Sequence, residues 1–206
     1  MPSARHLVLK RRSLALQKHF LPRRPSLTGK YSKMQLDRIA AYFVLAHAEL
    51  ESYIEDKVVE LIDYADSKWN PSRTSTWPLL CMLSYVHGEK KGPPENFDPN
   101  QFKDREFMAV TNSAMALHRG RVKVNHGVRE KNLCDLLFPV GFSHTDIDST
   151  LVASLDSFGQ RRGDFAHKSM HTIGGNQIDP FVEAANIATI VTGLETVDSH
   201  FQTLRR

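Results

Sequence analysis

The densest group of polar side chains that could do chemistry together lies between residues 159 and 168. The segment reads Gly-Gln-Arg-Arg-Gly-Asp-Phe-Ala-His-Lys, so two arginines, a histidine and a lysine fall close together. Histidine can accept or donate a proton near neutral pH. Arginine can hold a phosphate with its fork of donors and stabilise charge in a transition state. These groups suit RNA cleavage without a metal ion, although composition alone favours ordinary exposed charges beside a chance histidine.

Three polar residues outside this segment are weaker candidates for contact with a substrate. His47 lies on the apolar stripe of a long predicted helix, where an imidazole needs a hydrogen-bond partner. Glu51 lies one turn later and could orient or tune a basic group. For both, the pattern slightly favours a polar contact in the core or at an interface. Asn132 begins a short predicted helix and could touch substrate or cap a turn.

Other site patterns are absent from the sequence. It contains no glycine-rich phosphate loop, no G-x-S-x-G and no H-E-x-x-H. None of the ten histidines forms a metal-type pair with a third ligand, so we expect no metal ion and no cofactor. The two cysteines, Cys81 and Cys134, cannot build a disulfide framework and have no zinc-type spacing. We therefore expect a reducing, cytoplasmic location.

The elements that position these residues are predicted to be helices. The clearest begins near Gln35 and continues for about 30 residues, a rod of roughly 45 Å that needs the full-length partners of a bundle. Its apolar stripe is spaced three or four residues apart and consists of Leu36, Ile39, Ala40, Phe43, His47, Leu50, Ile54, Val58, Leu61 and Ala65.

Further helices are expected over residues 79–86, 107–117, 128–138 and around 147–158. A last helix starts with Asp179 as its cap and Pro180 at its first position. The stripe that we predict for this last helix consists of Val182, Ala185, Ala188, Ile190, Val191, Leu194, Val197 and Phe201. The expected fold class is all-α, a bundle of about five to seven helices with long loops.

The charge is unevenly distributed. Eight of the 27 Lys and Arg residues lie in residues 1–30, where there is no acid, so the rest of the chain is mildly acidic. We therefore divide the chain into a basic N-terminal arm, residues 1–34, and a helical domain, residues 35–206. The arm could attract polyanions through counterion release, and the plainer alternative is a solvated tail. Pro22 and Pro25 argue against an organellar transit peptide. No run approaches the roughly 20 apolar residues of a membrane span.

Three ordered segments resemble one protein family. Arg162-Gly163-Asp164-Phe165-Ala166-His167 looks like the R-x-x-x-x-H motif of the HEPN superfamily of helical ribonucleases. Residues 125–133, followed by 136–137 and 140–142, are similar to the segment before that motif in the RiboL-PSP-HEPN branch. Residues 47–54 resemble that branch's first long helix. The similarity covers roughly residues 36–204.

The resemblance implies a bundle that dimerises and places two copies of the motif at a shared cleft. It also implies a metal-independent endoribonuclease, leaving a 2′,3′-cyclic phosphate, in a toxin or phage-defence setting with an antitoxin or defence partner. Arg162 and His167 would be the catalytic pair. The residues that we add as candidates for binding the RNA are Arg161, Lys168, Asn132, Glu51 and His47. The alternatives are a non-catalytic HEPN module that binds a protein or nucleotide, and a nucleic-acid binder acting through residues 1–30.

Helix geometry limits how the catalytic pair can meet. Five residues turn an α-helix by about 500°, so Arg162 and His167 point about 140° apart. They converge only if the long arginine reaches around the helix, if the helix is distorted near Gly163, or if a second copy supplies one group across a twofold axis. We therefore tie activity to a homodimer.

Overall fold

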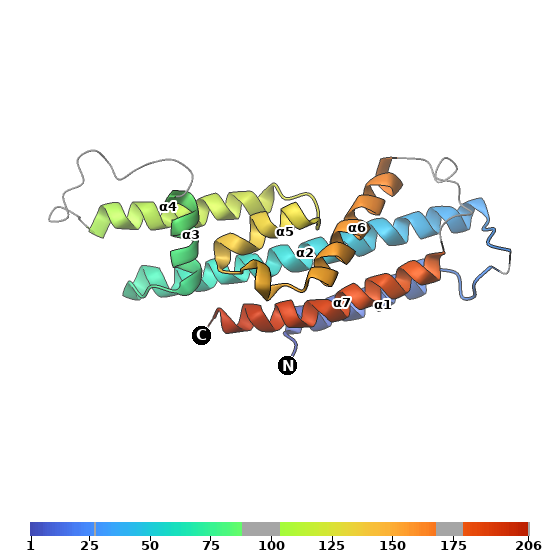
Figure 1. The fold of residues 1–206 in the computed structure, drawn as a ribbon, viewed down its shortest axis with the longest axis horizontal. Coiled ribbons are helices and arrows are strands. Elements are labelled where there is room, and N and C mark those ends of the chain that lie inside the picture. The colour runs from blue at the N-terminus through green and yellow to red at the C-terminus, as the bar shows by residue number, and fades with distance from the viewer. Residues whose placement is uncertain (27, 88–103, 168–178, 206) are drawn as a thin grey trace. The chain divides into compact units, whose positions relative to one another are not determined.

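The computed structural model describes residues 1–26, 28–87, 104–167 and 179–205. Within these ranges the chain folds into helices and two short 3₁₀ turns, η2 (Phe138–Val140) and η3 (His144–Asp146), without strands. The α-helices (Figure 1) are α1 (Ala4–Phe20), α2 (Lys33–Ser72), α3 (Trp77–His87), α4 (Asp104–Lys123), α5 (Glu130–Leu137), α6 (Ser149–His167) and α7 (Pro180–Thr203). The predicted all-α class is confirmed.

The chain divides into two compact units. Unit 1 consists of Met1–Ile54, His126–Lys131 and Ile147–Ser199. Unit 2 consists of Glu55–Asn125, Asn132–Asp146 and His200–Arg206. Helices α2 and α7 each contribute residues to both units. Most of the candidate site residues lie in unit 1, whereas Asn132 lies in unit 2.

The core of unit 1 is built on the predicted stripe of α2. Ile39, Phe43, Leu50 and Ile54 are buried at the expected three- or four-residue spacing. Phe43 meets Phe158 of α6, with 6.3 Å between the ring centroids. Helix α2 is longer than predicted, 40 residues, and ends just before Arg73, which takes a left-handed φ of 56°.

The structure differs from the expectation of a solvated N-terminal arm. Residues 4–20 form α1, which begins at a Ser3 cap and buries His6, Leu9 and Leu16. The Ser3 amide donates to Asp198 of α7 over 2.6 Å, and His6 Nε2 donates to the Val191 carbonyl over 2.8 Å. Three buried residues at helical spacing are enough to attach a basic helix, because its charges can remain on the other faces.

The start of α7 is as predicted, but its predicted stripe is buried only from Ile190 onward. The Asp179 carboxylate accepts from the Phe181 amide over 2.8 Å, and the helix begins at Pro180. Val182, which we expected in the stripe, is 55% exposed, and Ala185 and Ala188 are exposed too. The residues that α7 buries are Ala184, Ile187, Ile190, Val191, Leu194, Val197 and Phe201. Apolar residues occur around most of this helix, so its pattern alone could not select the face.

Unit 2 has its own core around the second half of α2, with Val58, Leu61 and Ile62 buried. A tight turn follows η2, where Gly141 takes a φ of 108°. A Cβ added at Gly141 would lie 2.7 Å from Trp77 Cδ1, so glycine is needed there for both reasons.

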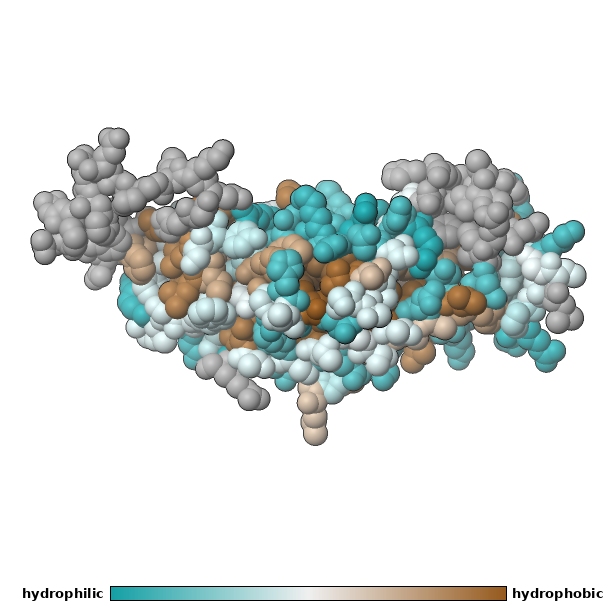
Figure 2. All heavy atoms as spheres, in the orientation of Figure 1, coloured by the Kyte–Doolittle hydropathy of each residue, from teal (hydrophilic) through white to brown (hydrophobic). Residues whose placement is uncertain are grey.

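Hydrophobic and hydrophilic side chains are interleaved over the visible face of the molecule (Figure 2). Among the described residues, no helix combines the length and the hydropathy that a bilayer crossing demands.

Candidate functional site

Arg162 extends the buried stripe of α6 by one turn. Leu151, Leu155 and Phe158 are buried at helical spacing, and Arg162 follows Phe158 by four residues. The side chain is consequently half-buried. Its Nε is shielded from solvent and makes no hydrogen bond within the described residues. Helix α6 is continuous to His167, and Gly163 keeps a negative φ, so the helix is not broken at the glycine.

The structure places His47 of α2 beside this arginine. The imidazole is 2% exposed and packs on Phe158, with 6.0 Å between the ring centroids. Burial, and secondly the positive charge of Arg162, lower the pKa of His47 from 6.5 to about 4. His47 is therefore neutral at pH 7, so it carries no positive charge that would repel the guanidinium of Arg162.

Glu51 completes this cluster from one turn further along α2. Its Oε2 lies 3.6 Å from His47 Nδ1, which is too far for a hydrogen bond. Because His47 is neutral at pH 7, the contact is not an ion pair at that pH. The side chain of Glu51 is 17% exposed. His47 therefore has a carboxylate of α2 on one side and is close enough to the guanidinium of α6 for that charge to affect its pKa.

Arg161 takes a different direction from its neighbour. Its Nη2 forms an ion pair with Glu183 of α7 over 3.1 Å, and its Nη1 donates to the Ser157 hydroxyl over 3.0 Å. The carboxylate of Glu183 also acts on Tyr42 of α2. Burial, and secondly the charge of Glu183, raise the pKa of Tyr42 to about 12. Any phosphate bound by Arg161 would have to compete with the carboxylate of Glu183.

The remaining predicted site residues either lie outside the described side chains or belong to unit 2. His167 is the last residue of α6, and its side chain lies outside the described part of the chain, as does the whole of Lys168. Asn132 belongs to unit 2, where its Nδ2 donates to Asn125 Oδ1 over 2.9 Å. Asn125 in turn donates to Glu55 over 2.8 Å. Asn132 is thus part of a chain of side-chain hydrogen bonds within unit 2.

The short segment before α5 holds the middle of α6. Arg129 Nε lies 3.0 Å from the Asp156 carboxylate, which also accepts from the Glu130 amide over 3.3 Å. The hydrogen bond from Arg129 is the main reason that the pKa of Asp156 is lowered. A Cβ added at Gly159 would lie 2.9 Å from Arg129 Cγ. These contacts orient the turn of α6 that carries Arg161 and Arg162.

Comparison with known families agrees with the all-α fold class. The family described as RiboL-PSP-HEPN matches residues 9–192. The chain belongs to the RiboL-PSP-HEPN family. Neither the search of curated proteins nor the search of solved structures returned a significant match. In this RiboL-PSP-HEPN chain the matched region begins inside α1, so it reaches further towards the N-terminus than the sequence segments suggested.

Two residues of the site in this RiboL-PSP-HEPN chain were missed by the sequence analysis. Glu183 and Tyr42 lie far from the motif in sequence; Glu183 pairs with Arg161, and its charge contributes to the raised pKa of Tyr42. No spacing links residue 183 to residue 161, so the sequence held no signal for the ion pair. Tyr42 could have been found only as a further member of the buried face of α2.

Proposed function

We propose that the protein is a metal-independent endoribonuclease whose catalytic pair is Arg162 and His167. The observation that carries the proposal is the position of Arg162. It stands half-buried beside a neutral histidine, on the same continuous helix as His167, in a chain of the RiboL-PSP-HEPN family. Because the Nε of Arg162 is shielded from solvent, the direction of its guanidinium is restricted, which favours recognition of a phosphate.

In the proposed reaction, the 2′-hydroxyl of a ribose attacks the adjacent phosphorus and the bond to the 5′-oxygen breaks. His167 removes the proton from the 2′-hydroxyl or donates one to the leaving 5′-oxygen. Arg162 binds the non-bridging oxygens and stabilises the charge that accumulates on them. The products are a 2′,3′-cyclic phosphate and a free 5′-hydroxyl, so this step consumes no water.

His47 and Glu51 have a positioning role in this proposal. His47 is 2% exposed, so RNA does not reach its ring directly. Its neutral ring packs beside Arg162 without repelling it, and Glu51 adds a negative charge one turn away. Together they restrict where the guanidinium can point, which preserves its geometry before the substrate arrives.

The test is cleavage of RNA in excess EDTA by wild type, Arg162→Ala and His167→Ala, with Arg161→Ala as the matched control. We expect Arg162→Ala and His167→Ala each to lose about a hundredfold or more. Arg161→Ala should lose less than about tenfold, because its guanidinium is engaged by Glu183. Equal rates for wild type, Arg162→Ala and His167→Ala would reject the assignment.

We further propose that two chains share the site. The side chains of Arg162 and His167 leave a continuous helix about 140° apart, so a twofold axis is the simplest way to bring them together. Mixing Arg162→Ala with His167→Ala would then rebuild an intact pair between chains and restore about a quarter of the activity. Full activity of a monomer, or no recovery in the mixture, would contradict the shared site.

The biological setting that we propose is a toxin or phage-defence nuclease with an antitoxin or defence partner, as the family resemblance implies. A dimer that binds RNA or a partner protein but leaves RNA intact in every condition would instead indicate a non-catalytic HEPN module.

A further inference from the structure

The basic residues of α1 and of the segment after it fall into two groups. Arg5 and Arg12 are engaged with α2, through Ser52 at 3.1 Å and Glu49 at 3.0 Å. The exposed cations that make no ion pair with any described residue are Lys10, Arg11, Lys18, Arg23, Arg24 and Lys30. No acid precedes Asp37 in the sequence, so these charges are not compensated from their own segment.

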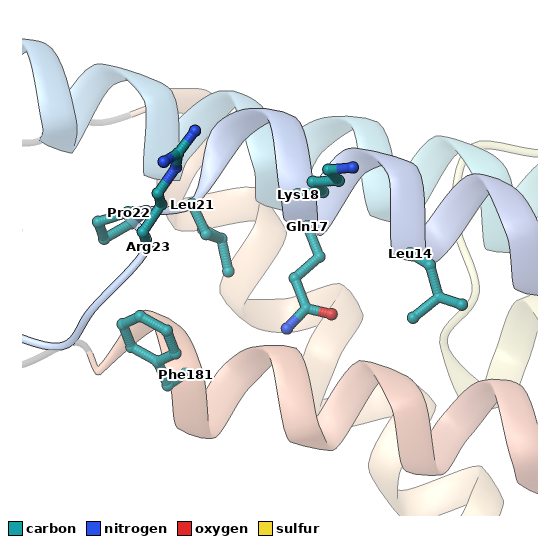
Figure 3. Close-up of a pocket in the computed structure, with 7 residues that line it drawn as sticks. All are labelled: Leu14, Gln17, Lys18, Leu21, Pro22, Arg23 and Phe181. Carbon is teal, nitrogen blue, oxygen red and sulfur yellow. The ribbon is translucent and has the colours of Figure 1, made fainter.

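A pocket of about 470 Å³ lies in unit 1 where α1 ends beside the start of α7 (Figure 3). The antiparallel register of the two helices explains its place, because Ser3 meets Asp198, and His6 meets Val191, at the other end of α1. The residues around the pocket include Gln17, Lys18, Leu21, Pro22, Arg23 and Phe181.

The pocket combines an aromatic wall with a basic rim. Figure 3 shows Gln17 and Leu21 pointing from α1 towards α7, with the Phe181 ring facing the turn at Pro22. Arg23 extends away from that ring, and both Arg23 and Lys18 are exposed. The two acids closest in sequence to Phe181 are both engaged: the Asp179 carboxylate accepts from the first amides of α7, and Glu183 pairs with Arg161.

We propose that this face binds a single strand of RNA, with one base in the pocket against Phe181 and phosphates on Lys18 and Arg23. An aromatic ring in a pocket whose rim carries uncompensated cations is a usual combination in sites for single-stranded nucleic acid. The Gln17 amide can donate to and accept from a base edge. Lys10 lies about 12 Å back along α1, so the basic face continues beyond the pocket. The choice of RNA as the polyanion rests on the proposed ribonuclease function.

The experiment measures the binding of a fluorescent 2′-O-methyl RNA, which cannot undergo attack by a 2′-hydroxyl, at several salt concentrations. For Lys18→Gln/Arg23→Gln we expect weaker binding and a salt slope that is smaller by about 1.4, because each cation lost from a single-strand contact contributes about 0.7. The matched control is Lys68→Gln/Lys123→Gln, which removes two exposed cations from unit 2 and should keep the wild-type slope. For Phe181→Leu we expect binding weaker by roughly fivefold or more with an unchanged slope.

Equal weakening by the two double substitutions would overturn the proposal, because it would show attraction by net charge alone. Wild-type affinity of Phe181→Leu would overturn the base pocket. Far-UV circular dichroism verifies that each variant is folded, and the exposed positions of Lys18 and Arg23 make their substitution harmless to the core. Because the probe cannot be cleaved, its binding is measured independently of nuclease activity. The proposed nuclease function and the proposed RNA-binding face can therefore each be rejected without the other. Binding of the probe without cleavage of ordinary RNA would reject only the nuclease, and cleavage with unaltered probe binding by the pocket variants would reject only this face.

Discussion

The buried His47 should make the folding stability of the protein depend on pH between about 4 and 6.5. Its folded-state pKa is about 4, against 6.5 without burial. Between these values the unfolded chain binds the proton and the folded chain does not. The stabilising contribution is therefore complete above pH 6.5, is lost progressively as the pH falls from 6.5, and is gone once the pH has fallen through 4.

The size of the effect follows from the shift. A difference of this extent corresponds to about 3 kcal/mol when fully expressed, and to about 2 kcal/mol between pH 7.5 and pH 5.0. His118 of unit 2 should contribute similarly, since burial is the main reason that its pKa is lowered to about 4. Other groups also titrate in this range, so the comparison between variants is more informative than the total.

The assay is denaturant unfolding at pH 7.5 and pH 5.0, followed by far-UV circular dichroism. Tryptophan fluorescence would not serve, because Trp69 and Trp77 both lie in unit 2. In His47→Gln the fall in the free energy of unfolding should be smaller than in wild type by about 2 kcal/mol. The exposed His126→Gln is the control and should keep the wild-type fall. An identical fall in wild type and His47→Gln would refute the neutral, buried state of His47.

Two further predictions concern the attachment of α1 and the turn after η2. Asp198 is fully buried and accepts from the Ser3 amide, the Ser3 hydroxyl and the Tyr53 hydroxyl, so Asp198→Asn should lower the free energy of unfolding by about 1–3 kcal/mol. An unchanged unfolding curve would contradict this account of how α1 is held. Gly141→Ala should destabilise by about 2 kcal/mol or more, whereas Gly120→Ala, in open space within α4, should stabilise by up to about 1 kcal/mol. Thermal unfolding distinguishes the two signs.

Much of the secondary structure could be predicted because it depends on neighbours in the sequence. The stripe of α2 from Ile39 to Ala65 is buried as its spacing predicted, and Asp179 caps α7 because a carboxylate two residues before an amide can reach it. The buried face of the first half of α7 could not be predicted in the same way. Val182 and Ile190 are both apolar, and only the neighbouring helices decide which of them is covered.

The candidate site shows the same division. The motif singled out Arg162 and His167, and the stripe of α2 singled out His47 as a histidine among apolar residues. The sequence could not show that His47 lies beside Arg162 or that Glu183 forms an ion pair with Arg161, because these residues are far apart in the chain. One step along a helix turns a side chain by about 100°, so two neighbouring arginines meet different helices once the bundle is packed.

Residues 1–30 mark the boundary between the two kinds of information most clearly. The sequence by itself determined their charge, eight basic residues and no acid, and that property persists in the exposed cations of α1. Only the tertiary structure decided that the segment is part of unit 1, because its attachment depends on Asp198 and Val191 near the other end of the chain. Charge is a property of each residue alone, whereas burial needs a partner surface that folding must first assemble.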